Sequence, residues 1–141
     1  MEKIRKIGVL TDKVITQLDL ENTKFQDLKK LQKNSAILCS DSTIEHIKNE
    51  HPEDYEKYKD EMSIILEQPD YIGIHPKRGS IEYFKEYVLE GTKERVIVAI
   101  RATKKQTLFV RSMYVVSNEN FENFLQKNTI QPYKKDHSAL L

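Results

Sequence analysis

The stretch from Arg101 to Tyr114 contains two arginines, a serine and a tyrosine whose side chains suit contact with a phosphate group. Its β-branched and aromatic residues favour two paired strands joined by a turn. On such strands, the guanidinium groups of Arg101 and Arg111 are able to contact phosphate through two hydrogen bonds and to stabilise charge in a transition state. The stretch therefore predicts a phosphate-binding site, with the hydroxyls of Ser112 and Tyr114 close by.

The register of this hairpin decides which of these side chains meet. If Arg101 pairs with Leu108, then Arg101, Ser112 and Tyr114 share one face, because side chains alternate along a strand. A shift of one residue instead groups Arg101 with Arg111. Either register leaves a guanidinium on the sheet surface, where the alternative role is a cross-strand ion pair or a solvated edge.

Two of the four histidines, His46 and His51, lie in one short segment that is predicted to be helical. They are about 140° apart around an ideal helix, which excludes the i, i+4 metal pair of zinc proteases. His46 is expected to face solvent or a groove, whereas His51 either does the same or faces the core. Histidine changes charge near neutral pH, so a histidine beside an arginine suits general acid–base cleavage of RNA without a metal.

Three other side chains between His51 and the hairpin are further candidates for the site. His75 precedes Pro76 in a basic turn and is a further candidate for proton transfer. Tyr83, like Tyr114, either stacks an unpaired base or packs a helix on the sheet. Lys85 either contacts phosphate or protects an edge strand against aggregation.

Helices are predicted on both sides of the hairpin region. Asp41 or Ser42 is expected to cap a helix that ends at Pro52. A second, longer helix then begins at Pro52 and closes at Pro69, with apolar residues at the 3.6-residue period. Ser117 is expected to cap a last helix.

Strands dominate the chain after Pro69, where β-branched and aromatic residues become frequent. Residues 81–89 also fit a helix capped by Ser80, but their alternation favours a strand. Four successive strands imply an antiparallel sheet. The predicted strands are 70–74, 81–88, 95–101 and 107–116.

These elements predict an α+β fold, in which N-terminal helices precede a four-stranded antiparallel sheet and a C-terminal helix. The long helix would cover one face of the sheet and leave the other face free to bind. We divide the chain into an N-terminal extension packed on the core, a central α+β domain and a C-terminal tail. The three parts are residues 1–35, 36–127 and 128–141.

The composition suits one globular domain, with 38% hydrophobic and 32% charged residues. Cys39 is the single cysteine, and one thiol forms neither a disulfide nor a two-cysteine metal site. We therefore expect no metal and no cofactor. No stretch approaches the roughly 18 apolar residues of a membrane helix, so we expect a cytoplasmic protein without membrane contact.

The charges are segregated although the net charge is only +1. Residues 41–61 contain eight acidic and three basic side chains, whereas residues 74–111 contain nine basic and four acidic ones. A basic face attracts nucleic acid, and the alternative is an ordinary solvated surface.

The chain resembles the phage- and mobile-element-borne branch of the barnase-EndoU-colicin-RelE nuclease superfamily in the order of its short motifs. The resemblance covers about residues 36–127. It implies helices before a four-stranded antiparallel sheet, and metal-independent RNA cleavage through a cyclic phosphate. Barnase-like members also use a glutamate, for which no position in this sequence stands out. The motifs are His46-Ile47, His51-Pro52, Pro69-Asp-Tyr-Ile72, Lys85, Arg101 and Arg111-Ser-Met-Tyr114.

The resemblance also implies roles for individual residues. His46 or His51 would be the general acid or base, Lys85 and Arg101 would hold the phosphate, and Ser112 with Tyr114 would orient it. The full candidate set has a catalytic part and a substrate-binding part. The catalytic part is His46, His51, Arg101, Ser112 and Tyr114, and the substrate-binding part is Tyr83, Lys85 and Arg111.

Our leading hypothesis is a small endoribonuclease that cleaves single-stranded RNA by attack of the 2′-hydroxyl. It would be a toxin or effector of a phage or mobile element, with an inhibitor protein as a partner. The alternative is a non-catalytic module of the same fold that binds protein or nucleic acid. A third hypothesis, a DNA-binding phage protein, predicts duplex affinity that falls steeply with salt.

Overall fold

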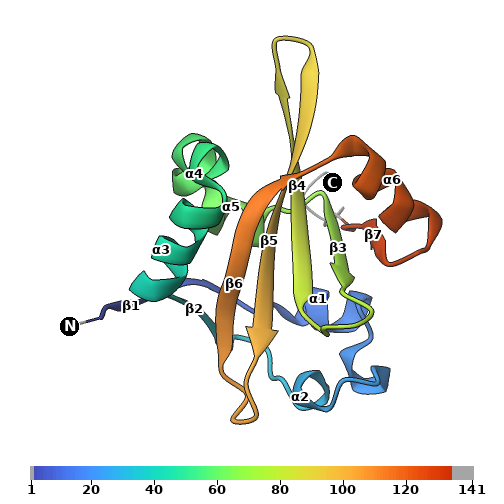
Figure 1. Ribbon diagram of the computed structural model, residues 1–141. Coiled ribbons are helices and arrows are strands. Elements are labelled where there is room, and N and C mark those ends of the chain that lie inside the picture. The colour runs from blue at the N-terminus through green and yellow to red at the C-terminus, as the bar shows by residue number, and fades with distance from the viewer. Residues whose placement is uncertain (1, 135–141) are drawn as a thin grey trace, which may run out of the picture.

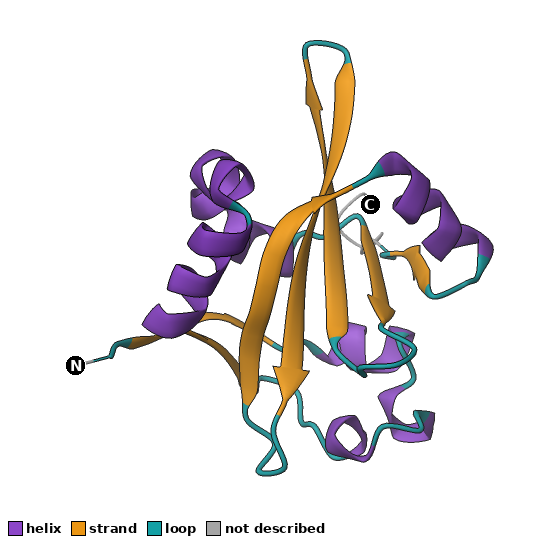
Figure 2. Cartoon of the chain, viewed as in Figure 1, coloured by secondary structure: helices purple, strands orange, loops and turns teal. Residues whose placement is uncertain are grey.

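The computed structural model describes residues 2–134, in which six α-helices and two short 3-10 helices pack on one mixed β-sheet (Figures 1 and 2). The α+β class is therefore confirmed. The first half of the chain forms β1 (Ile4–Val9), α1 (Asp12–Gln17), η1 (Leu20–Asn22), α2 (Gln26–Lys29), β2 (Ala36–Ser40), α3 (Asp41–Glu50), α4 (Pro52–Tyr58), η2 (Lys59–Glu61) and α5 (Met62–Glu67). The second half forms β3 (Tyr71–Ile74), β4 (Ile81–Leu89), β5 (Thr92–Ala102), β6 (Leu108–Val116), α6 (Asn118–Gln126) and β7 (Ile130–Pro132).

The sheet has seven strands over the described residues, not the predicted four, in the order β1-β2-β6-β5-β4-β3-β7. The four predicted strands are β3 to β6, and they pair antiparallel as an uninterrupted meander. The prediction missed the outer strands because each is short and its partner is distant in sequence. β2 joins β6 in parallel through only two residue pairs, and β1 then pairs antiparallel with β2.

The C-terminal segment joins the sheet in part. Residues 130–132 form β7, which pairs antiparallel with β3, and Ile130 is buried. We had assigned this stretch to the polar tail because three residues carry too little periodic signal to indicate a strand. Residues 135–141 of that tail lie outside the described residues.

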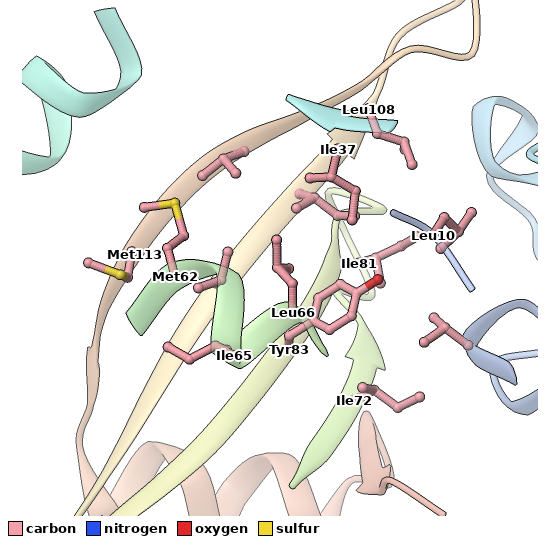
Figure 3. Close-up of a cluster of buried hydrophobic side chains, with 14 of the residues drawn as sticks. Leu10, Ile37, Met62, Ile65, Leu66, Ile72, Ile81, Tyr83, Leu108 and Met113 are labelled. Atoms are coloured by element: carbon pink, nitrogen blue, oxygen red, sulfur yellow. The ribbon is translucent and has the colours of Figure 1, made fainter. Parts of the chain in front are cut away.

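The first 35 residues share the main core of the molecule. Leu10, Val14, Leu20 and Leu28 are all buried in the same apolar cluster as the central strands. The cluster lies between the sheet and helices α1 to α5, and Figure 3 shows Met62, Ile65 and Leu66 of α5 within it. The leucines of the first segment therefore help to position β4 to β6.

The helix predictions hold with two differences. Ser40, rather than Asp41 or Ser42, caps α3, since its Oγ accepts a hydrogen bond from the Thr43 amide. Pro52 ends α3 and occupies the first turn of α4, as predicted. The long helix expected after it is divided into α4, η2 and α5. Ser117 caps α6, as predicted.

The two faces of the sheet differ in their cover. The core face carries Tyr83, which pairs with Val98, and these side chains belong to the main core under α1 to α5. The opposite face, which we call the open face, carries Phe84 and Ile97, on which Phe121 of α6 packs. Within residues 2–134, α6 is the only α-helix that contributes to that second cluster, whereas five α-helices contribute to the main core.

Candidate active site

A β-bulge in β6 brings the hairpin residues to the open face. Arg101 pairs with Phe109, which is one residue away from the pairing with Leu108. The register then shifts beside Ala99, which pairs with Ser112 and leaves Arg111 as the extra residue of the bulge. Since the extra residue interrupts the alternation, the adjacent residues Arg111 and Ser112 share a face, and both of the groupings considered from sequence occur together. Arg101, Arg111, Ser112 and Tyr114 all belong to the open face.

Glu82 is the buried carboxyl group of this face. It pairs with Ala99 on β5, so it lies one strand from Ser112. Glu82 is only 6% exposed, and its carboxyl group has no hydrogen bond or ion pair among the described residues. Burial raises the pKa of Glu82 to about 7, against the opposing effect of the positive charges of Arg78 and Arg111. A carboxyl group with this pKa is able to exchange a proton near neutral pH.

A cavity of about 400 Å³ opens over Glu82. One wall is the loop from His75 to Arg78, between β3 and β4. The other wall is α6, which contributes Asn123 and Phe124. The cavity is thus large enough for small-molecule or nucleotide groups and has a titratable residue in its lining.

The other side of the site is formed by the junction of α3 and α4. The ring of His51 stacks on Tyr114, with 4.8 Å between the ring centroids and 22° between the planes. Asp54 accepts a hydrogen bond from the Val115 amide at 3.0 Å, which fixes this junction to β6. Burial, and then the charge of Glu82, raise the pKa of Tyr114, so its hydroxyl stays protonated at neutral pH.

Two predicted substrate-binding residues, Tyr83 and Lys85, lie on the face of the sheet opposite Glu82. Tyr83 is buried in the main core, and its hydroxyl has no partner among the described residues. Lys85 lies on the same face and donates to the carbonyl of Gln68 at 2.8 Å. The physical reason is the alternation of β4, which sends Tyr83 and Lys85 away from the face that Glu82 occupies.

His46 and Arg101 lie at the margins. The side chain of His46 is 54% exposed, and its Nε2 lies 3.3 Å from a carboxylate oxygen of Glu50, one helical turn away. Arg101 is exposed and lines a hollow of about 140 Å³ together with Arg78 and residues of α2. The structure therefore places Arg111, Ser112 and Tyr114 on the face of Glu82, with His51 stacked on Tyr114 and His46 elsewhere.

Sequence reasoning missed Glu82, His75 as a cavity residue, and Arg78. A signal for Glu82 existed, because it is an acidic residue between Ile81 and the aromatic pair Tyr83 and Phe84 in a strand whose first four residues are all buried. A charged residue within such a run is rare unless it is paired or functional.

Neither a metal site nor a membrane helix is found within residues 2–134. These residues contain no group of three or more histidine, cysteine, aspartate or glutamate side chains placed to hold a metal ion. None of their helices has the length and apolar character needed to cross a membrane.

Comparison with known proteins supports the same class of chemistry. The model of the family described as phage-Barnase-EndoU-ColicinE5/D-RelE like nuclease3 matches residues 8–123, which is most of the chain. No curated protein and no solved structure matches. The family match confirms the resemblance predicted from the motifs, and it begins at residue 8 where the predicted resemblance begins at residue 36. The chain therefore belongs to this family of nucleases of the barnase, EndoU, colicin and RelE type.

Proposed function

We propose that this protein is a metal-independent endoribonuclease in which Glu82 is the general base. The observation that carries the proposal is the buried, unpaired carboxyl group of Glu82 beside Arg78 and Arg111, with a pKa of about 7. A general base is most effective when its pKa lies near the working pH. The family match supports nuclease chemistry in general, and the choice of RNA is our own inference.

RNA supplies its own nucleophile, which suits this set of side chains. The Glu82 carboxylate would accept the proton of the 2′-hydroxyl as its oxygen bonds to phosphorus. The bond from phosphorus to the 5′-oxygen then breaks, leaving a 2′,3′-cyclic phosphate and a 5′-hydroxyl. DNA lacks the 2′-hydroxyl, so the same residues would leave DNA intact.

Positive charge for the phosphate comes from the same face. Arg78 and Arg111 both act electrostatically on Glu82 and on Tyr114, so their charges surround the carboxyl group. Guanidinium groups beside a bound phosphate stabilise the negative charge that grows on its oxygens during attack. We assign phosphate binding to Arg78 and Arg111, with Ser112 as a neighbouring hydrogen-bond donor and Arg101 at the margin.

We assign His51 as the general acid that protonates the leaving group. Its ring is stacked on Tyr114, which holds it at the edge of the open face beside the proposed phosphate site. A protonated His51 would give its proton to the departing 5′-oxygen, and the same stacked pair offers an aromatic surface to an unpaired base. We extend the proposal to single-stranded RNA as the substrate, because exposed base faces are needed for such stacking.

The biological role is part of the same proposal. The family name associates these nucleases with phage, which supports a toxin or effector of a phage or mobile element. RNA in the bacterial cytoplasm would be the target, and a nuclease of this kind would require an inhibitor protein in its own host.

The test compares wild type with Glu82→Gln and a matched control, Glu86→Gln, on the same strand and face. Each protein is incubated with mixed cellular RNA in excess chelator, and fragment ends are analysed for 2′,3′-cyclic phosphate. Loss of a general base typically costs 10²–10⁴-fold in rate, so we expect a drop on this order for Glu82→Gln and near wild-type cleavage for Glu86→Gln.

Three results would contradict the proposal. Cleavage by Glu82→Gln at the wild-type rate would remove Glu82 from the chemistry. Cleavage that requires added metal would exclude the proposed mechanism. Binding of RNA by a folded wild type that cleaves neither mixed RNA nor defined oligonucleotides would favour the non-catalytic module, and salt-sensitive binding to duplex DNA would favour the DNA-binding protein.

A further inference from the structure

The loop that carries His75 is held in one conformation by its own backbone and by Phe25. The Gly79 amide donates to the His75 carbonyl, and the His75 amide donates to the Ser80 carbonyl, both at 2.9 Å. Gly79 has φ +72°, and a Cβ on it would lie 2.5 Å from the Phe25 ring. Because only glycine fits there, the loop is fixed and the His75 imidazole has a defined place.

Nδ1 of this imidazole accepts two backbone hydrogen bonds. The amide of Lys77 donates to it at 3.1 Å and the amide of Arg78 at 3.0 Å. A ring nitrogen that accepts hydrogen bonds from two N–H groups uses its lone pair to do so. If it carried a proton, that proton would face and repel the two amide hydrogens. The neutral imidazole must therefore carry its proton on Nε2, and a second proton on Nδ1 would break both bonds.

The charges around His75 also oppose a second proton. Lys77 and Arg78 lie on its own loop, Arg111 lies on β6, and Lys127 follows the C-terminal end of α6 across the cavity. Glu82 is the one acidic residue among those that line the cavity. Burial, followed by Arg78, Arg111 and Lys77, lowers the pKa of His75. The imidazole is therefore neutral at pH 7.

Nε2 of His75 has no partner among the described residues, and the side chain lines the cavity over Glu82. We propose that His75 is a neutral hydrogen-bond donor, whose Nε2–H binds a non-bridging oxygen of the substrate phosphate and which takes no part in proton transfer. A neutral imidazole in this role stabilises growing negative charge without giving up its proton. The catalytic part of the inference rests on the proposed nuclease function, whereas the phosphate site can be tested separately.

The first experiment measures the tautomer directly. Long-range ¹H–¹⁵N NMR spectra of wild type are recorded from pH 5 to 8, with His75→Asn used to assign the signals. We expect the Nε2–H tautomer down to pH values below the usual histidine pKa of about 6.5. An Nδ1–H tautomer, or a doubly protonated ring at pH 7, would overturn the inference.

The second experiment adds inorganic phosphate to the same sample. We expect the His75 Nε2–H signal to shift in a saturable way, and phosphate affinity to fall in His75→Asn. Absence of a shift at His75, at phosphate concentrations that saturate any site on the protein, would contradict the phosphate contact. Neither measurement depends on RNA cleavage.

The third experiment separates the two nitrogens by substitution. In His75→Asn, the amide oxygen is placed to accept from the Lys77 and Arg78 amides, but the donor at Nε2 is lost. In His75→Gln, the longer side chain places its N–H near the position of Nε2. We expect His75→Asn to keep the wild-type melting temperature within a few degrees and to lose roughly 10²-fold in kcat. His75→Gln should recover part of that loss.

The pH dependence decides between donor and proton carrier. We expect kcat/KM of His75→Asn to be lowered by a similar factor at every pH, because the donor does not titrate in the working range. If the substitution instead removes one limb of the pH profile, His75 is a general acid or base and the inference is wrong. An inactive wild type whose NMR and phosphate results are as expected would refute the nuclease proposal alone.

Discussion

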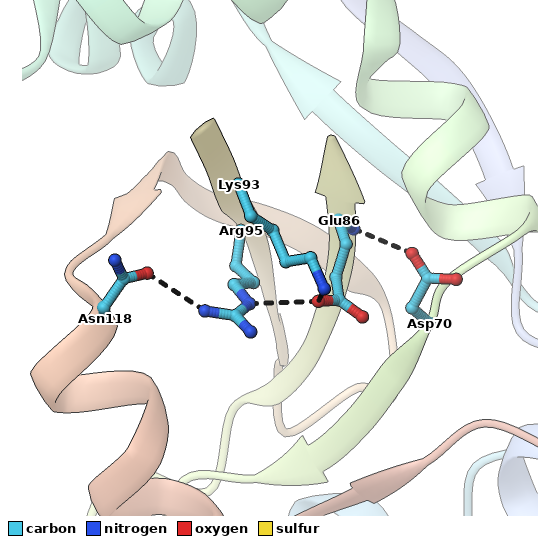
Figure 4. A network of polar contacts seen from close by, with 5 residues as sticks. All are labelled: Asp70, Glu86, Lys93, Arg95 and Asn118. Atoms are coloured by element: carbon cyan, nitrogen blue, oxygen red, sulfur yellow. Dashed lines mark hydrogen bonds and ion pairs between the residues drawn. The ribbon is translucent and has the colours of Figure 1, made fainter. Parts of the chain in front are cut away.

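Glu82 and Glu86 lie on the same face of the same strand, four residues apart, and have opposite surroundings. The Glu86 carboxylate accepts a hydrogen bond from Nε of Arg95 at 3.1 Å and lies 3.4 Å from Nζ of Lys93. Figure 4 shows this network, in which Arg95 also donates to Asn118 at the start of α6. Glu82 has no such partner among the described residues, although it is more deeply buried.

The difference teaches what each carboxylate does. A partly buried acid such as Glu86, which accepts a hydrogen bond from one cation and faces a second, stabilises the local structure around the hairpin and α6. A buried acid without partners costs stability, because ionisation in a low dielectric is unfavourable. Such a cost persists where it serves function, and the cavity over Glu82 is where we place the chemistry. The same residue type therefore belongs to the scaffold at one end of the open face and to the site at the other.

The strongest test of this comparison replaces the arginine near Glu82, Arg111, and separately the arginine beside Glu86, Arg95. Arg111→Ala is expected to lower kcat/KM roughly 10²–10³-fold, as loss of a preorganised transition-state donor does. Arg95→Ala should leave the rate near wild type, since its guanidinium is engaged with Glu86 and packs over the Phe121 ring. Steady-state kinetics on a defined oligonucleotide measure both. Equal losses in two folded variants would remove the distinction between the two ends.

Arg111→Ala also sharpens the assignment of Glu82. The charge of Arg111 lowers the pKa of Glu82 and partly offsets the effect of burial. Without it the pKa of the carboxyl should rise, so the basic form appears at higher pH. We expect the ascending limb of the kcat/KM profile to move to higher pH, and an unmoved limb would argue that Glu82 is not the titrating base.

The second prediction concerns stability. The folded-state pKa of Glu82, about 7, lies above the unfolded value of 4.5, so the native state binds this proton more tightly. Wild-type stability should therefore fall as pH rises between about 4.5 and 7, and the penalty is complete above that range. Glu82→Gln removes the ionisation, and at pH 8 it should be more stable than wild type by about 3 kcal/mol.

Urea unfolding at pH 5 and pH 8 measures this effect. The advantage of Glu82→Gln should be small at pH 5, where the wild-type carboxyl is mostly protonated in the native state. An advantage of the same size at both pH values would show that the substitution acts through packing instead. If Glu82→Gln is inactive and yet more stable, the loss of stability that the ionised Glu82 causes is retained because the carboxylate is needed for activity.

The smallest expected effect is at the other glutamate. Glu86→Gln keeps a hydrogen-bond acceptor for Arg95 but loses the attraction to Arg95 and Lys93, so it should lower stability by about 1 kcal/mol. Its effect should shrink at high salt, because the contact with Lys93 is partly exposed. Urea unfolding at two salt concentrations provides the measurement. A gain in stability would contradict the view that Glu86 stabilises the structure.

Local patterns predicted much of the framework. The strands expected at 81–88 and 107–116 are observed at 81–89 and 108–116, and Ser117 and Pro52 act as predicted at the helix ends. These features depend on residues within a few positions of each other, since side-chain alternation, capping and the geometry of proline are local. β1, β2 and β7 were missed because they are defined by distant partners.

The site was harder to predict than the framework. The sequence predicted both Lys85 and Arg111 as phosphate ligands, yet they lie on opposite faces of the sheet. Glu82 was not predicted as a site residue. Its burial depends on the strands that pair with β4 on both sides and on the cavity wall that α6 supplies. Periodicity shows which residues share a face but not which face is covered.

By itself, the sequence determined the family, the α+β class and the four central strands, since each depends on motif order or short-range periodicity. Only the tertiary structure decided that Arg111, Ser112 and Tyr114 share a face with Glu82, because an unpaired residue in a bulge changes the alternation. It also decided that Glu82 is buried near two arginines, and that two amides hold His75 by Nδ1. Burial and charge at a site are properties of neighbours brought together by folding, and no local pattern contains them.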